Sequence, residues 1–104
     1  MADVPYRFER DASAAELADR FKSLEAGEET DVTVSVAGRL MLRREMGRLA
    51  FGTLRDWSGS IQLFAGRNWT EDFEGFGHLS LGDWIGATGE VVRTKTGELS
   101  VKVR

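Results

Sequence analysis

The first regular pattern along the chain has the period of an amphipathic helix. Ser13 and Glu16 have the spacing of a capping box, in which each side chain accepts a hydrogen bond from the other residue's backbone N–H. Apolar residues then recur every three or four positions, at Ala14, Leu17, Phe21 and Leu24. The pattern predicts a helix from Ser13 to about Gly27, preceded by an extended lead-in over residues 1–12.

From Val32 onward the apolar period changes to two, which is typical of a half-buried strand. Gly38 interrupts this alternation, and we expect a bulge or a sharp bend there. The strand continues through Leu40 and Leu42 towards Arg44, and a turn follows at residues 45–47.

The same alternation predicts four more strands, at about 48–55, 60–65, 83–94 and from Glu98 onward. The residues expected to point inward are Ala50, Gly52, Leu54, Ile61, Leu63, Leu99, Val101 and Val103. On the last strand, Glu98, Ser100 and Lys102 are expected to point outward.

A short helix is predicted between the third and fourth of these strands. Thr70, Glu71 and Asp72 have the character of a helix start, and Phe73, Phe76 and Leu79 would form its buried stripe. Five strands with a bend in the first and a helix after the third indicate an all-β fold, a five-stranded Greek-key OB-fold barrel. We therefore divide the chain into an N-terminal extension with its helix, residues 1–30, and the barrel, residues 31–104.

One phase of the second and third strands carries residues that an ordinary core hairpin does not favour. Phe51 is in step with Thr53, and Gln62 and Phe64 are in step with Ser60. Two aromatic rings and an amide on one polar face suit stacking on, and hydrogen bonding to, an unpaired nucleic-acid base. The alternative is that Phe51 belongs to the core, and periodicity leaves both readings open.

Charge and composition narrow the function classes. Net charge is −5 over residues 1–34, +4 over 35–68 and −2 over 69–104, so the hairpin region is locally basic and suited to phosphate. The chain has no Cys, one His, no phosphate-binding Gly-rich loop and no nucleophile elbow, so we expect no catalytic or metal site in it. It has no apolar run long enough for a membrane helix and no signal-peptide pattern, which favours a cytoplasmic protein.

Four segments resemble the N-terminal anticodon-binding domain of bacterial lysyl-tRNA synthetases, which are class IIb aminoacyl-tRNA synthetases. They are VSVAGRL (34–40), LAFGTLRDWSGSIQLF (49–64), LGDWIGATGEV (81–91) and RTKTGELSVKV (93–103). The run RTKTGELS resembles the lysyl branch in particular. The resemblance implies binding of the uridine-rich anticodon of lysine tRNA.

The resemblance also implies which side chains bind. The family's stacking Phe matches Phe51 and its base-reading Gln matches Gln62. The remaining matches are Arg44, Glu98, which would accept from the neighbouring base, and the aromatic position Phe64. From their basic character and position we add three candidate phosphate contacts, Arg39, Arg43 and Lys95.

The class II catalytic domain of these enzymes has no counterpart in the chain. The resemblance therefore implies a domain that binds tRNA without aminoacylating it, within a parent lysine–tRNA ligase that uses ATP and Mg²⁺ and is a homodimer. Two alternatives remain at this point. One is the same barrel in a bifunctional lysyl-phosphatidylglycerol synthase, and the other is a generic OB domain that binds single strands. A protein-interaction barrel with no RNA role is a further possibility.

Overall fold

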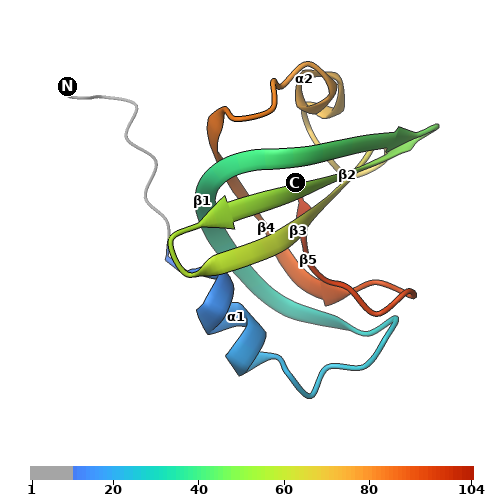
Figure 1. Cartoon of the computed structure of the whole chain (residues 1–104). Coiled ribbons are helices and arrows are strands. Elements are labelled where there is room, and N and C mark those ends of the chain that lie inside the picture. Colours follow the sequence, from blue (N-terminus) through green and yellow to red (C-terminus); the bar gives the residue numbers. More distant parts are fainter. Residues whose placement is uncertain (1–10) are drawn as a thin grey trace.

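Five strands and two short helices form the part of the chain described by the computed structural model, residues 11–104 (Figure 1). The strands close into a barrel in the order β1-β2-β3-β5-β4, with β3 and β5 parallel and every other pair antiparallel. The predicted OB-fold barrel, with its N-terminal helix and its helix after the third strand, is confirmed. In chain order the elements are α1 (Ala14–Arg20), β1 (Glu29–Met46), β2 (Leu49–Asp56), β3 (Gly59–Gly66), α2 (Phe73–Gly77), β4 (Trp84–Arg93) and β5 (Leu99–Val103).

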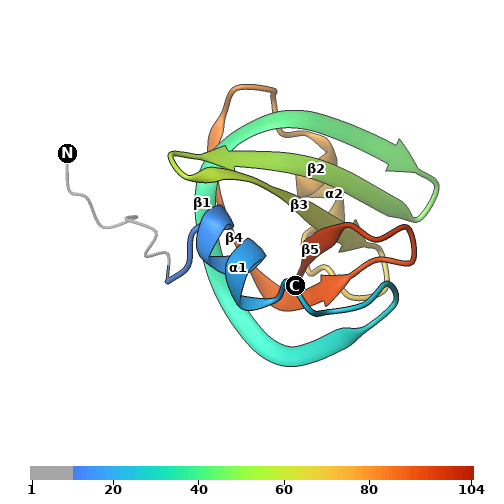
Figure 2. The ribbon, with the colours of Figure 1, turned by 60° about the horizontal axis from the view of Figure 1, so that its bottom comes forward.

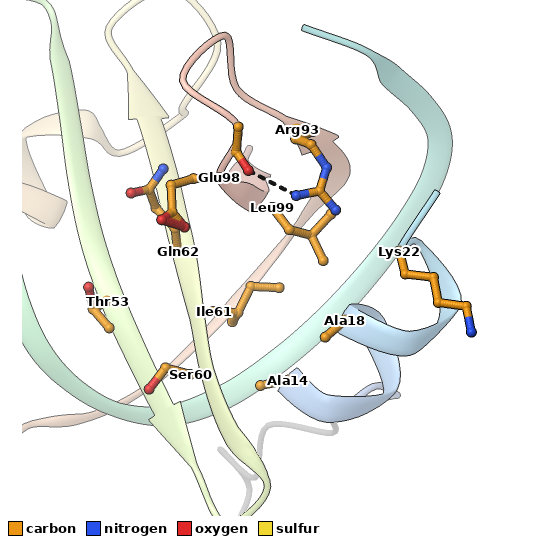
Figure 3. Close-up of a pocket in the computed structure, with 11 residues that line it drawn as sticks. Ala14, Ala18, Lys22, Thr53, Ser60, Ile61, Gln62, Arg93, Glu98 and Leu99 are labelled. Atoms are coloured by element: carbon orange, nitrogen blue, oxygen red, sulfur yellow. Dashed lines mark hydrogen bonds between the residues drawn. The ribbon is translucent and has the colours of Figure 1, made fainter. Parts of the chain in front are cut away.

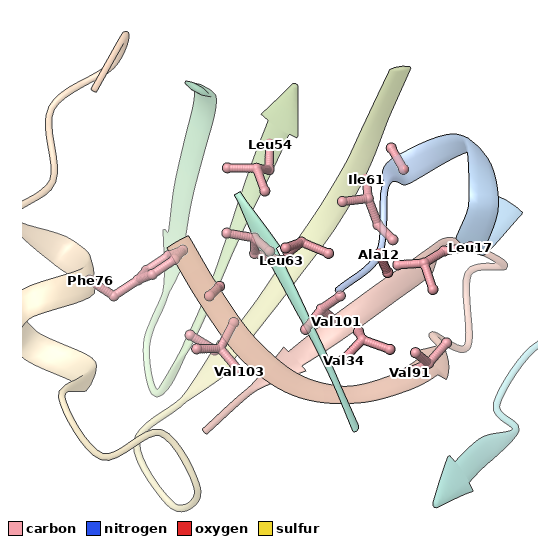
Figure 4. Close-up of a cluster of buried hydrophobic side chains, with 14 of the residues drawn as sticks. Ala12, Leu17, Val34, Leu54, Ile61, Leu63, Phe76, Val91, Val101 and Val103 are labelled. Carbon is pink, nitrogen blue, oxygen red and sulfur yellow. The ribbon is translucent and has the colours of Figure 1, made fainter. Parts of the chain in front are cut away.

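The inward phases of the strands fill the barrel with aliphatic side chains, and the two helices lie at its opposite ends (Figure 1). Figure 4 shows Leu17 of α1 at one end of this cluster and Phe76 of α2 at the other. Burial of the core supplies most of the driving force for folding. The predicted inward residues of β2 and β3 all lie in the interior, and the fully buried large side chains include Leu17, Val36, Leu40, Leu54, Leu63, Val91 and Val101.

Strand β1 curls around the barrel, so that its first half lies beside β4 and its second half beside β2 (Figure 2). Gly38 lies where the strand changes partners, and a Cβ there would collide with the backbone carbonyl of Arg55. The predicted bend at Gly38 is therefore correct. The bulge lies further on, at Met41, because Leu40 pairs with Leu54 while Leu42 pairs with Thr53.

Helix α1 begins as predicted but ends earlier. The Glu16 N–H donates to Ser13 Oγ at 3.2 Å and the Ser13 N–H donates to Glu16 Oε1 at 2.8 Å, which confirms the capping box. The predicted end near Gly27 is wrong, because the helix ends at Arg20. The segment after the helix lies instead against the end of β4, where the Gly27 N–H donates to the Arg93 carbonyl at 2.9 Å.

Thr70 was expected to start the short helix, and the structure gives it a different role. Its buried Oγ1 donates to the Val103 carbonyl at 2.7 Å and accepts from the Gly66 N–H at 3.0 Å, so Thr70 ties β3 to the end of β5. The helix starts after Asp72, whose carboxylate caps it by accepting from the Gly75 N–H.

A carboxylate joins α1 to the β2–β3 turn. Asp56 Oδ2 accepts from the Ala14 N–H at 2.9 Å, and Oδ1 accepts from the N–H and the hydroxyl of Ser58 and from the Gly59 N–H. Burial raises the pKa of Asp56, but the hydrogen bonds from Ser58, Ala14 and Gly59 together outweigh burial and hold the pKa below its usual value of 3.8.

We predict that Asp56→Asn lowers the free energy of unfolding by about 2 kcal/mol at pH 7, because an amide nitrogen would face the Ala14 N–H. The folded-state pKa is depressed, so the carboxylate stabilises the fold above the unfolded pKa and loses this effect as the pH falls through the folded pKa. In urea titrations the difference between the wild type and Asp56→Asn should therefore shrink below about pH 4. A difference that stays constant from pH 7 to pH 3 would contradict this assignment.

Candidate nucleic-acid interface

A row of aromatic and basic side chains crosses the outer face of the barrel over four strands. Arg44 of β1 pairs with Phe51 of β2, Phe51 pairs with Phe64 of β3, and Phe64 pairs with Lys102 of β5. The Phe51 and Phe64 rings are stacked, with their centroids 4.9 Å apart and their planes 7° apart. Trp69 meets Phe64 edge-on at 5.0 Å and extends the aromatic row.

The burial pattern decides between the two readings of Phe51. Phe51 and Phe64 are partly exposed, and neither belongs to the buried core cluster. Their neighbours on β2, Ala50 and Gly52, are buried. The outward phase of Phe51 is confirmed, and the alternative that placed it in the core is wrong.

A second row, of polar character, runs parallel to the first. Leu42, Thr53, Gln62 and Ser100 are successive cross-strand partners on β1, β2, β3 and β5. Gln62 Nε2 donates to Ser100 Oγ at 2.9 Å, which holds the amide on the outer face beside the aromatic row. Ser100 was expected to point outward and does share this side with Gln62, but it is fully buried.

Glu98 lies in the loop between β4 and β5, at the edge of a hollow that Gln62 also lines (Figure 3). Arg93 holds this loop in place. Its Nη1 donates to the Gly97 carbonyl at 2.8 Å, and its Nη2 donates to the Phe21 carbonyl beyond α1 at 3.2 Å. The backbone of the loop is thereby tied to the end of the N-terminal helix, and the loop carries the exposed Glu98 side chain beside the sheet.

Three surface hollows open along this face and share lining residues. Gln62 lines the first together with Glu98, and it lines the second together with Arg44 and Phe51. Phe51 also lines the third, together with Lys95. The predicted base-binding residues therefore line three hollows that share residues, and we call these hollows together the groove.

The structure separates the three candidate phosphate contacts. Lys95 is exposed in the β4–β5 loop beside the groove. Arg39 Nη1 donates to the Gly82 carbonyl at 3.0 Å, and its guanidinium lies 5.9 Å from the Trp84 ring. The guanidinium of Arg43 donates to the Leu79 carbonyl in the α2–β4 connection, and Arg43 also lines the hollow that contains Arg44 and Phe51.

The bulge at Met41 adds two residues to the groove that periodicity did not assign to it. Because Met41 is an extra residue, Leu42 falls into step with Arg44 and Met46 rather than with the buried Leu40. Leu42 and Met46 are 60% and 52% exposed and line the same hollow as Phe51. A single inserted residue has no signature in the sequence, so alternation alone could not reveal this change of phase.

Periodicity also did not assign Trp69 to the aromatic row, because this residue lies in the connection between β3 and α2, which has no regular pattern. It packs where Gly66 has no side chain, since a Cβ at Gly66 would collide with the indole ring. Lys102 Nζ lies 4.7 Å from the centre of the Trp69 ring and 3.7 Å from a Glu29 carboxylate oxygen, so this cation is already partly engaged within the domain. Among residues 11–104, no helix has both the length and the apolar character needed to cross a membrane.

Comparison with known proteins agrees with the geometry. A family model described as an OB-fold nucleic acid binding domain, of the tRNA anticodon type, matches residues 34–104. The lysine–tRNA ligase of Trichormus variabilis is 43% identical over 109 residues, which covers 95% of this chain and 19% of the ligase. The ligase of Synechococcus sp. (strain RCC307) is 50% identical over 103 residues, covering 95% and 20%. That of Thermosynechococcus vestitus is 46% identical over 110 residues, covering 99% and 22%.

The chain thus spans about a fifth of the length of the curated relatives that it matches. The resemblance to lysyl-tRNA synthetases drawn from the four sequence segments is confirmed over nearly the whole chain. This chain belongs to the family of OB-fold anticodon-binding domains and is homologous to the matching region of lysine–tRNA ligases.

Proposed function

We propose that this domain binds the anticodon loop of a lysine tRNA and reads its central uridine, in the cytoplasm, for a ligase that attaches lysine to that tRNA using ATP. The observation that carries the proposal is the partly exposed Phe51 ring, stacked on Phe64 beside the tethered amide of Gln62. Together these groups offer an unpaired base a stacking surface and a hydrogen-bonding edge at the same place on one face.

Stacking has a defined direction here. Phe64 on β3 covers one face of the Phe51 ring with a nearly parallel ring, so the other face of Phe51 is turned towards β1. A base bound on that face would add a third ring to the existing stack of Phe64 and Phe51, and no further side chain would have to become ordered. Arg44, the β1 partner of Phe51, lies in the same hollow and would supply a charged donor to the base edge or to a phosphate.

Glu98 gives the groove a second side chain, besides Gln62, that can hydrogen-bond to the edge of a base. Its carboxylate lies in the loop that borders Gln62, and a carboxylate accepts hydrogen bonds from the imino or amino groups of a neighbouring base. The exposed cations around the groove, Arg44 and Lys95, and Arg39 further along the same sheet face, would hold the backbone phosphates.

Catalysis is assigned to other parts of the ligase. Within residues 11–104, no cluster of three or more Asp, Glu or His side chains could hold a metal ion. We place the ATP and Mg²⁺ used by the ligase, like the expected dimer interface, in its other parts.

We predict that Phe51→Ala weakens binding of the lysine anticodon stem-loop by roughly 5- to 150-fold, because an aromatic stacking partner is worth about 1–3 kcal/mol per base. The measurement is a fluorescence-anisotropy titration at fixed salt. Trp57→Ala is the control, since Trp57 is an exposed aromatic residue in the turn at the far end of β2.

The wild-type domain should also bind this stem-loop more tightly than one whose central uridine is replaced by cytidine. Equal affinity for the two loops would reject base reading and leave a generic single-strand binder. If Phe51→Ala merely unfolded the domain, with binding unchanged in the folded fraction, the stacking role of Phe51 would be rejected.

We predict a smaller contribution from Leu42. A nucleotide in the groove would cover its exposed side chain, so Leu42→Ser should weaken stem-loop binding about three- to tenfold. Leu81→Ser is a matched control, because Leu81 is 61% exposed, against 60% for Leu42, and lines none of the three hollows. Equal binding by the two variants, both with wild-type thermal stability, would exclude Leu42 from the interface.

A further inference from the structure

The hydroxyl of Ser100 connects the base-reading amide to the backbone of the β4–β5 loop. Ser100 is completely buried. Its Oγ accepts a hydrogen bond from Gln62 Nε2 at 2.9 Å and donates one to the backbone carbonyl of Glu98 at 3.2 Å. A buried hydroxyl with two partners is ordered, because losing either bond leaves a polar group unsatisfied.

The chemistry of these three groups fixes the direction of the chain of hydrogen bonds. A backbone carbonyl only accepts, so the single proton of the Ser100 hydroxyl points to Glu98. Ser100 Oγ must then accept from its other neighbour, and the part of the Gln62 amide that donates is its nitrogen. The amide is therefore oriented with Nε2 towards Ser100, leaving one N–H and the Oε1 acceptor for a ligand.

This orientation distinguishes the two pyrimidines. Uracil presents the N3–H donor next to a carbonyl acceptor, which matches the free Oε1 and N–H of Gln62. Cytosine presents the N3 acceptor next to an amino donor, so it would place a lone pair against Oε1. To bind cytosine equally well the amide would have to turn over, which would bring Oε1 against Ser100 and break the bond to Glu98.

We propose that Ser100 is the positioning residue that makes this site prefer uracil to cytosine, by holding the Gln62 amide in one of its two orientations. The inference rests on the proposed function, because it assumes that Gln62 contacts the base. The pairing of β3 with β5 supports it, since Gln62 and Ser100 are cross-strand partners in that parallel pair. The acceptor is fixed as well, because the Glu98 carbonyl also accepts from the Thr94 N–H at 2.9 Å, which closes the loop.

The test compares the affinities of the folded domain for the central-uridine and central-cytidine stem-loops. In Ser100→Ala the Gln62 amide is free to turn over, so the ratio of the two affinities should fall about three- to tenfold. Ser35→Ala is a matched control, because its hydroxyl is bonded to Thr88 between β1 and β4 and has no link to Gln62. The ratio should not change in Ser35→Ala.

A double-mutant cycle shows whether Ser100 acts through the amide. Gln62→Ala alone should abolish most of the preference, and adding Ser100→Ala to it should change the ratio no further. A wild-type ratio in Ser100→Ala, with the preference lost in Gln62→Ala, would overturn the role of Ser100 and leave the proposed function standing. A further fall of the ratio in the double variant would also overturn it. A wild-type domain with no preference would instead overturn the proposed function.

Discussion

The double pairing of β3 is the constraint on which the binding face depends. Two outward residues of β3 have a partner on both sides: Gln62 lies between Thr53 and Ser100, and Phe64 lies between Phe51 and Lys102. Because cross-strand partners are fixed by backbone hydrogen bonds, the stacked rings and the tethered amide are set by the closure of the barrel rather than by flexible loops. Preorganisation of this kind lowers the entropic cost of binding a single strand.

Strand β1 completes this face with two local irregularities. Gly38 allows the backbone to pass close to β2 where β1 changes partners, and the bulge at Met41 then reverses the phase of the strand. In a regular ladder Met41 would pair with Thr53, and Leu42 would then point into the barrel. With the bulge, Leu42 and Met46 are exposed on either side of Arg44, which donates to the Met46 sulfur at 3.7 Å. The same strand thus closes the core in its first half and borders the groove in its second.

Local patterns predicted what depends on local periodicity. The inward phase of Ala50, Ile61 and Leu63 followed from alternation, and the start of α1 followed from the Ser13–Glu16 spacing. The missed features depend on contacts distant in sequence. The buried Ser100 is hydrogen-bonded to Gln62, 38 positions away, and the Thr70 hydroxyl that joins β3 to β5 is hydrogen-bonded to Val103, 33 positions away. The segment after the early end of α1 is likewise held by a distant contact, the hydrogen bond from the Gly27 N–H to the Arg93 carbonyl.

The central claim is that the row of Phe51 and the row of Gln62 form the surface that contacts the anticodon. The most direct measurement is an NMR titration of the ¹⁵N-labelled domain with the lysine anticodon stem-loop. The account predicts that the largest amide shifts fall on residues around Phe51, Gln62 and Glu98, which line the groove. Shifts concentrated instead where β1 pairs with β4, around Ser35 and Thr88, would contradict it.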